Sequence, residues 1–130
     1  MHPLRIVGAV VLAAGLAAGC SVTSPSDLTQ QTFTGTVSPG GNAQFVFTQN
    51  KTGEFIAKLT AIAPDSGATL GGQYGSPVSN GCAVIGNNPL GGVNTEFFDI
   101  TLPAGSYCFQ VYDSGTLPRA QTFTLLIEHS

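Results

Sequence analysis

Charged side chains are scarce in this sequence, and tryptophan is absent from it. Only 8% of the 130 residues are Asp, Glu, Lys or Arg, and the formal net charge is −3. Because no basic stripe could neutralise a row of phosphates, nucleic acid and anionic lipid surfaces are poor candidates as partners. The lack of tryptophan, with only three tyrosines, also argues against a carbohydrate site built on stacked aromatic rings.

Histidine is nearly as scarce, and this limits the available chemistry. His2 lies at the start of the chain and His129 lies one residue from its end, where we expect the backbone to fray. Ser-His-Asp and Cys-His catalysis needs a positioned imidazole. The sequence also lacks a Gly-x-Ser-x-Gly elbow, a histidine-rich metal pattern and a phosphate-binding glycine loop. We therefore expect no enzyme activity, no metal site and no cofactor.

Long apolar runs are absent, with one exception at the start of the chain. Arg5 precedes an uncharged run over residues 6–18, and a small residue comes directly after it, which is the layout of a secretory signal. This run of about 13 residues is short for a membrane-spanning helix, which needs about 20. We therefore predict that residues 1–19 are a signal peptide that is removed after export.

The residues around Cys20 indicate how the chain is processed after export. Ala17-Ala18-Gly19-Cys20 resembles the bacterial lipobox, and the resemblance implies cleavage just before Cys20 and lipidation of that cysteine. An ordinary signal followed by an unpaired thiol is the alternative. A lipid with more than one acyl chain would anchor the protein stably to a membrane. We expect an envelope location, periplasmic or surface-exposed, with the anchor in the outer membrane if the cell has one.

The two remaining cysteines are expected to pair. Cys82 and Cys108 are an even pair in an oxidising compartment, which predicts a disulfide between them. The bond would close a loop of about 27 residues and stabilise the fold by roughly 3 kcal/mol on the chain-entropy model. No thiolate would then remain as a nucleophile or a metal ligand.

The chain after Cys20 divides into a tether and one domain. Residues 20–31 are polar and contain a proline, which is typical of a flexible tether. Residues 32–130 alternate apolar and polar side chains with a period of two, in runs separated by Gly, Pro, Asn or Asp. No stretch of the domain carries a helical period over ten residues. The pattern predicts an all-β domain, an antiparallel β-sandwich or jelly roll.

The alternation also predicts which side chains face the core, because successive residues of a strand point to opposite faces. The residues expected to point inward are Phe55, Ala57, Leu59, Ala61, Phe98, Ile100, Leu102, Tyr107, Phe109, Val111, Phe123, Leu125 and Ile127.

The stretch 70–93 breaks this pattern. It is rich in Gly and Asn, its strand signals are weak, and we expect it to form a long loop anchored by Cys82. If Tyr107 and Phe109 face the core, Cys108 faces the opposite side of its strand. The disulfide would then fasten the loop across the outer side of that strand. Two roles stay open for the loop: a stapled cover or a ligand-binding loop.

The last third of the chain resembles a known bacterial family. "LPAGSYCFQVYDSG", residues 102–115, is similar to the penultimate hairpin of the pre-peptidase C-terminal domains, and "TFTLLIE" is similar to their final strand. "FTGTVSPGGNAQFVFT" is similar to their opening hairpin. The resemblance implies a jelly-roll β-sandwich on a secreted protein, serving as an accessory or binding module with an unspecified ligand.

Two carboxylates allow a metal hypothesis to be weighed. Asp99 and Asp113 could hold calcium with turn carbonyls if their strands lie together, but no Asp-x-Asp-x-Asp spacing supports this. The plainer interpretation is that Asp113 caps the "DSG" turn and Asp99 faces solvent.

Several apolar side chains fall opposite the predicted core and suggest a recognition surface. They are Val46, Ile56, Phe97, Tyr112 and Leu126. Tyr112 shares a face with Cys108, so we expect it beneath the long loop. Val46, Ile56 and Phe97, together with Tyr74 of the glycine-rich stretch, are the candidate residues of a binding surface.

These observations predict a non-enzymatic, lipid-anchored protein of the bacterial envelope that acts as an interaction or accessory module. Its partners would be the membrane, through the anchor, and an envelope protein or a glycan. A surface carbohydrate-binding module is the first alternative. A small envelope hydrolase or a metal-dependent protein is the second.

Overall fold

A computed structural model describes residues 28–130 as an all-β domain. The predicted signal peptide, Cys20 and most of the predicted tether lie outside the described residues. Eight strands succeed one another along the chain, and no helix occurs between residues 28 and 130. The strands are β1 (Thr29–Val37), β2 (Asn42–Gln49), β3 (Gly53–Ala63), β4 (Leu70–Val78), β5 (Gly81–Gly91), β6 (Glu96–Leu102), β7 (Gly105–Tyr112) and β8 (Gln121–His129).

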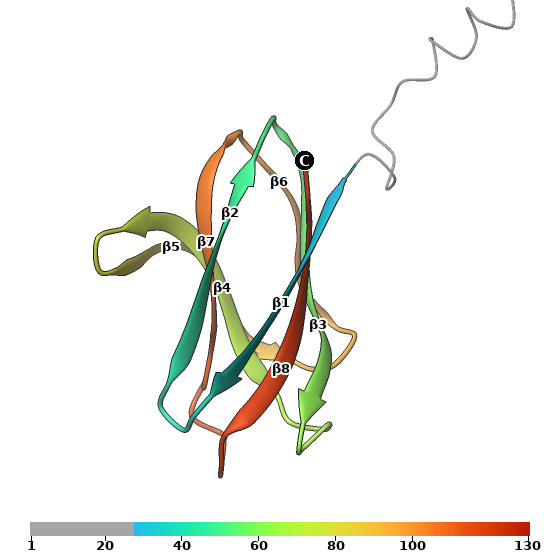
Figure 1. The fold of residues 1–130 in the computed structure, drawn as a ribbon, viewed down its shortest axis with the longest axis vertical. Coiled ribbons are helices and arrows are strands. Elements are labelled where there is room, and N and C mark those ends of the chain that lie inside the picture. The colour runs from blue at the N-terminus through green and yellow to red at the C-terminus, as the bar shows by residue number, and fades with distance from the viewer. Residues whose placement is uncertain (1–27) are drawn as a thin grey trace, which may run out of the picture.

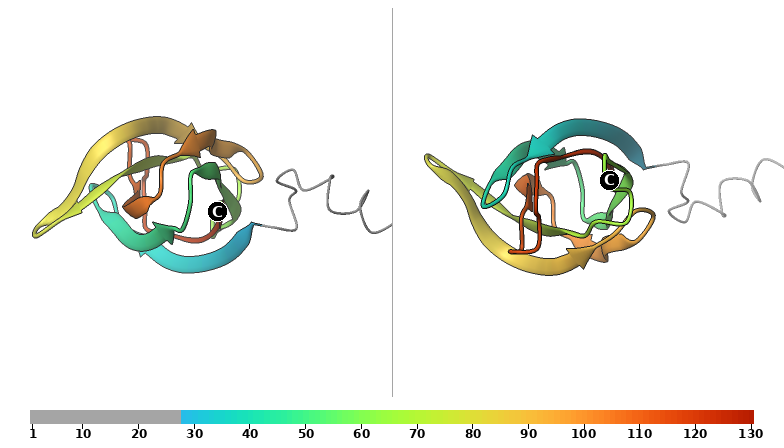
Figure 2. Two further views of the ribbon diagram at one scale, coloured as in Figure 1. Left: turned by 90° about the horizontal axis from the view of Figure 1, so that it is seen from above. Right: turned by 90° about the horizontal axis from the view of Figure 1, so that it is seen from below.

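The strands form two four-stranded antiparallel sheets that pack face to face (Figures 1 and 2). Sheet A has the strand order β1-β8-β3-β6, and sheet B has the order β2-β7-β4-β5. The strand pairs are nested along the chain: the first strand pairs with the last, the second with the second to last, and so on inward. The pairs are β1 with β8, β2 with β7, β3 with β6 and β4 with β5. This nesting is a long hairpin rolled over on itself, so the predicted jelly roll is confirmed.

A tight turn between β1 and β2 begins the roll, as the sequence predicts. Gly41 donates its amide hydrogen to the carbonyl of Ser38 at 2.7 Å, and Gly40 has a φ of 76° that suits glycine. The carboxylate of Asp113 accepts a hydrogen bond from the Gly40 amide at 2.8 Å. The turn is thereby joined to the segment after β7.

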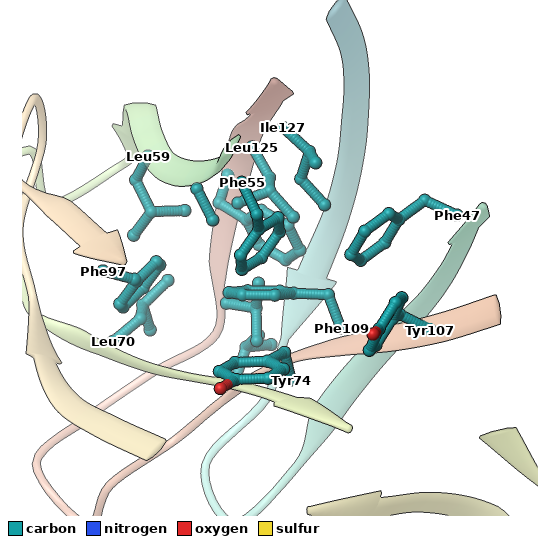
Figure 3. Packing of buried hydrophobic residues seen from close by; sticks show 14 of the residues in the cluster. Phe47, Phe55, Leu59, Leu70, Tyr74, Phe97, Tyr107, Phe109, Leu125 and Ile127 are labelled. Carbon is teal, nitrogen blue, oxygen red and sulfur yellow. The ribbon is translucent and has the colours of Figure 1, made fainter. Parts of the chain in front are cut away.

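Most of the predicted inward side chains form the core between the sheets. Phe55, Leu59, Phe109, Leu125 and Ile127 are inaccessible to solvent. Aromatic rings link the two sheets across this core (Figure 3): Phe55 of sheet A lies 5.1 Å from Phe47 and 6.3 Å from Phe109 of sheet B, centroid to centroid. Burial of these large side chains is the main stabilising contribution to the fold.

One β-bulge corrects the predicted inward face of β3. The register of β3 against β8 shifts between Leu59 and Ala61, so Thr60 is an extra residue. An extra residue exchanges the two faces of the strand beyond it. Ala61, which was expected to point inward, is therefore exposed, and Ile62 is buried.

A second bulge corrects the assignment of Phe97 to a binding surface. Ala57 pairs with Phe98 and Lys58 pairs with Glu96, so Phe97 is the extra residue in β6. It points inward, is only 4% exposed and lies 5.7 Å from Phe109 between ring centroids. Phe97 and the half-buried Phe98 both contribute to the core.

The stretch 70–93 is a β-hairpin, so the prediction of a long loop is wrong. β4 and β5 meet at a short turn, and the hairpin projects from the sandwich (Figure 1). Its glycines weaken the strand signal in the sequence, but they make room for aromatic rings. A Cβ atom at Gly72 or at Gly91 would collide with the ring of Phe97.

Tyr74 of this hairpin is a core residue and not part of a surface. Its side chain is 8% exposed and lies in the core near Phe55 (Figure 3). Its ring centroid is 5.5 Å from that of Phe55 and 5.0 Å from that of Phe98. Gly86 on β5 leaves space for the tyrosine ring. The assignment of Tyr74 to a binding surface is therefore wrong.

Both ends of the described chain are more ordered than the sequence suggests. β1 begins at Thr29, so residues 29–31, which were assigned to the tether, pair with β8. His129 was expected to fray, yet it pairs with both Thr29 and Phe55 and is 3% exposed. The reason is that β8 lies inside sheet A with a neighbour on each side.

Candidate functional site

The disulfide between Cys82 and Cys108 is present, as predicted. Its two Cα atoms are 5.8 Å apart, and Cys108 is completely buried. Cys108 lies between Tyr107 and Phe109, whose side chains face the core, so it occupies the outer face of sheet B. The bond fastens the β4–β5 hairpin to that outer face, as the alternation indicates.

Charge is divided unequally between the two sheets. None of the four strands of sheet B contains Asp, Glu, Lys or Arg. No such residue occurs between Asp65 and Glu96. The charged residues in the strands of sheet A are Glu54, Lys58, Glu96, Asp99 and Glu128. The outer face of sheet B is therefore a neutral surface.

A row of side-chain amides crosses this neutral surface. Gln44, Gln110, Gln73 and Asn87 stand opposite one another on β2, β7, β4 and β5, and we call them the amide row. The amide of Gln73 donates to Gln110 at 2.5 Å, and that of Gln110 donates to Gln44 at 2.9 Å. Gln44 in turn donates to the carbonyl of Gly81 at 3.3 Å, so the row ends at the hairpin turn.

Tyr112 lies beside the amide row on the same face. Its hydroxyl donates a hydrogen bond to the side-chain carbonyl of Asn87, which joins β7 to β5 across β4. The ring is half-buried against Gly71, where a Cβ atom would collide with three ring atoms. Tyr112 therefore shares a face with Cys108, as expected, but its ring lies over the backbone of β4 and not beneath the 70–93 segment, so that part of the prediction is wrong.

Apolar side chains flank the disulfide in the next row of the same face. Val46, Cys108, Gly75 and Val84 stand opposite one another across β2, β7, β4 and β5. Val46 is 61% exposed and Val84 is 49% exposed. The exposure predicted for Val46 is confirmed. Three further exposed apolar side chains, Val78, Ile85 and Leu90, lie on the hairpin itself.

The four candidate surface residues are not brought together. Only Val46 lies on the outer face of sheet B. Ile56 is half-buried in β3 of sheet A, opposite Asp99 and Glu128, while Tyr74 and Phe97 are in the core. Sequence reasoning missed the amide row, although Gln44 and Gln110 each occupy an outward position of an alternating run. The register that aligns them with Gln73 joins strands far apart in the sequence.

Carboxylates gather on the outer face of sheet A. A hydrogen bond with Asp99, partial burial and the nearby charges of Asp99, Glu128 and Glu96 raise the pKa of Glu54. Glu54 and Asp99 line a shallow hollow of about 330 Å³ with Gly53, Ile100 and Thr101. Among residues 28–130, no group of three or more His, Cys, Asp or Glu side chains is arranged to hold a metal ion.

Asp99 and Asp113 serve separate purposes. Asp99 is exposed on sheet A. Asp113 accepts hydrogen bonds from the amides of Gly40, Gly115 and Thr116 at 2.8 to 3.0 Å, and these contacts lower its pKa. The turn-capping role predicted for Asp113 is confirmed.

The buried imidazole of His129 has no nucleophile beside it. Its Nε2 lies 2.8 Å from the amide oxygen of Gln31, and its Nδ1 lies 3.0 Å from the carbonyl of Ser130. Neither ring nitrogen contacts a hydroxyl or a thiol in the described part of the chain. The arrangement serves to close the end of the sandwich, where the ring also packs 5.3 Å from that of Phe47.

A second hollow lies on the outer face of sheet A and is uncharged. It has a volume of about 350 Å³ and is open to solvent. It is lined by Thr34, Gly35, Thr36, Ala61, Ala63, Thr122, Phe123 and Thr124. The hydroxyl of Thr122 is already bonded to the carbonyl of Ala63 at 3.1 Å.

Within residues 28–130 the structure holds no helix long and apolar enough to cross a membrane.

The fold is similar to those of two solved bacterial proteins. The Yersinia pseudotuberculosis-derived mitogen matches with a TM-score of 0.56 and 16% identity, over 79% of this chain and 87% of that one. Aeromonas hydrophila PliG, a periplasmic lysozyme inhibitor of g-type lysozyme, matches with a TM-score of 0.53 and 17% identity, over 83% of this chain and 91% of that one. At such identities the likeness shows the fold alone.

No family model matches the sequence, and no curated protein matches it. The resemblance to the pre-peptidase C-terminal domains therefore stays a prediction.

Proposed function

We propose that this protein is a non-enzymatic binding module of the bacterial envelope, held to a membrane by a lipid on Cys20, and that its outer face of sheet B receives the partner. The observation that carries the proposal is the division of charge. All charged residues of the strands belong to sheet A, and the strands of sheet B have none.

A neutral face is suited to being covered. Removing a charged side chain from water costs several kcal/mol unless the charge finds a partner, whereas amide and apolar groups are desolvated more cheaply. The centres of protein interfaces are accordingly depleted in charged residues. Val46 and Val84 supply exposed apolar area on this face, and the amide row supplies hydrogen-bonding groups.

The hairpin is held in place before any partner arrives. The Cys82–Cys108 disulfide and the contact from Gln44 to Gly81 fasten it to the sheet. A surface ordered in advance loses less conformational entropy on binding. The fastening therefore favours recognition by a rigid surface.

The position at which β1 begins is compatible with this role. The start of β1 lies on the side of the molecule away from the turn of the β4–β5 hairpin (Figures 1 and 2). An anchor that leads to β1 leaves the hairpin and the outer face of sheet B free. The likeness to PliG, an inhibitor of another protein, also supports a binding role for this fold.

Site-specific photo-crosslinking in the native envelope tests the binding face. A photoreactive amino acid replaces Val46 or Val84 on sheet B, and Thr34 or Thr101 on sheet A as matched controls. We expect adducts from the two sheet B positions and none from the controls. Adducts from sheet A alone would overturn the proposal. A purified g-type lysozyme belongs among the proteins tested in vitro, with inhibition of its activity as the readout.

The anchor is tested separately by Cys20→Ser. The substitution removes the acylated thiol, so we expect the protein to move from the membrane fraction to the soluble fraction. Equal membrane retention of the variant and the wild-type protein would contradict the lipid anchor.

A further inference from the structure

Tyr112 presents an aromatic ring on the neutral face. Gly71 lies directly beneath the ring, and no other residue type would leave room for it there. The hydroxyl is held by Asn87, so the ring is oriented from both ends. Because Tyr74 and Tyr107 are buried, Tyr112 is the tyrosine of the described chain that solvent reaches most.

The amide row beside this ring keeps unused hydrogen-bonding capacity. A glutamine amide has two N–H donors and a carbonyl with two lone pairs. The contacts within the row use one donor each from Gln73, Gln110 and Gln44. A second donor on each side chain is left for a ligand, next to a carbonyl that can accept in turn.

A pyranose ring matches this combination of one aromatic ring and several amides, and such a site does not need the several stacked rings that the composition argues against. The C–H face of a pyranose stacks on an aromatic ring, and its hydroxyl groups pair with amide donors and acceptors. The absence of charge on the four strands favours a neutral sugar over an anionic one, because an anion would lose its hydration without gaining a cation. The apolar row of Val46 and Val84 would suit a peptide, whereas the ring of Tyr112 and the amide row beside it suit a saccharide.

We infer that the outer face of sheet B binds a neutral saccharide chain, with the Tyr112 ring as the stacking platform and the amide row as its hydrogen-bonding partner. The inference rests on the proposed binding role of this face. It adds the chemical class of the ligand, because the absence of charge on sheet B does not by itself identify what binds there.

Titration with defined saccharides tests the inference. The Cys20→Ser protein is monitored by backbone amide NMR during addition of chitohexaose, cellohexaose or an oligogalacturonate. We expect shifts at residues 71–75, 86–88 and 110–112 with at least one of the two neutral hexamers and none with the anion. Chitohexaose carries the N-acetyl groups of cell-wall glycans, and cellohexaose does not. The ratio of the two dissociation constants therefore shows whether the face prefers an N-acetylated glycan.

Three variants separate ring stacking from hydrogen bonding. Tyr112→Ala removes the platform and should weaken binding at least tenfold. Tyr112→Phe keeps the ring and should stay within threefold of the wild-type affinity. Gln110→Leu interrupts the amide row and should weaken binding at least threefold. Thr124→Ala on sheet A is the matched control and should change nothing.

The inference fails if neither neutral hexamer binds at millimolar concentration, if the anion binds more tightly, or if Tyr112→Ala and Gln110→Leu both bind as well as the wild type. The proposed function survives such a failure when crosslinks from Val46 and Val84 still lead to an envelope protein. Loss of those crosslinks as well would end both.

Discussion

Cys82 and Cys108 are joined although β4 lies between their strands. Pairing of β4 with β7 ends at Gly75, opposite Cys108. Beyond that point β4 pairs only with β5. The disulfide closes the distance between the unsupported part of the hairpin and the sheet, with Cα atoms 5.8 Å apart. An isolated two-stranded hairpin is marginally stable in water, so this bond helps to keep the hairpin and the outer face of sheet B in shape.

Removal of the disulfide should therefore destabilise the protein and release the hairpin. For Cys82→Ala with Cys108→Ala we expect the free energy of unfolding to fall by about 3 kcal/mol. Urea denaturation measures the change, and hydrogen exchange should quicken at residues 76–85 more than in β8. In the wild-type protein, labelling of Cys108 by a thiol reagent under non-reducing conditions would contradict the bond.

Acid should destabilise the protein through Asp65. Hydrogen bonds from Arg119 at 2.9 and 2.5 Å, and from Gln121 at 2.6 Å, lower the pKa of Asp65 from 3.8 to about 2. A carboxyl whose pKa is lower in the folded state stabilises the protein above its ordinary pKa and stops doing so as the pH falls through the folded value. Stability from this contact should therefore be lost between pH 4 and pH 2.

The comparison of wild type with Arg119→Gln isolates that contribution. Asp113, whose pKa is also lowered, is present in both proteins. We expect the variant to be less stable at pH 6 and equal to the wild type near pH 2, as measured by urea denaturation. A stability difference that stays constant over this pH range would rule out the linkage.

Glu54→Gln should stabilise the protein slightly at neutral pH. The pKa of Glu54 is raised, so its ionised form is less favourable in the folded chain than in the unfolded one. In the wild-type protein, the unfavourable contribution of Glu54 to the free energy of folding becomes smaller as the pH falls toward 4.5 and the carboxyl is protonated. Because the site is largely solvated, we expect a gain of about 0.5 kcal/mol or less. Thermal denaturation in low salt measures it, and 1 M salt should reduce it by screening the nearby charges of Asp99, Glu128 and Glu96.

Gly91→Ala should destabilise the hairpin from inside the core. A Cβ atom at Gly91 would overlap the ring of Phe97, which is held by Phe109 and cannot move freely. Overpacking of this kind costs about 1–3 kcal/mol. Gly92→Ala is the matched control, because the nearest atom to its Cβ, the hydroxyl oxygen of Thr95, is 3.9 Å away. Equal stability of the two variants in urea would contradict the packing.

Much of the fold was predictable because apolar and polar residues alternate along each strand, and this alternation can be seen in the local sequence. Phe55, Phe109 and Leu125 face the core as their alternation indicates. The pairing of Cys82 with Cys108 could be inferred from the number of cysteines remaining after Cys20. The pattern failed at Ala61 and Phe97, where single extra residues exchange the faces of a strand. A bulge is a property of the register between two strands and leaves no mark in either one alone.

Sequence by itself determined the all-β class, the neutrality of residues 66–95 and the pairing of two cysteines, since these depend on local pattern and composition. Tertiary structure alone decided that the glycines of this segment receive the rings of Phe97, Tyr74 and Tyr112, that the segment is a hairpin, and that Gln44, Gln110 and Gln73 stand in one row. Because glycine has no side chain, its presence in the sequence does not show which aromatic ring will pack against it. The alignment of distant strands is set by packing over the whole sandwich.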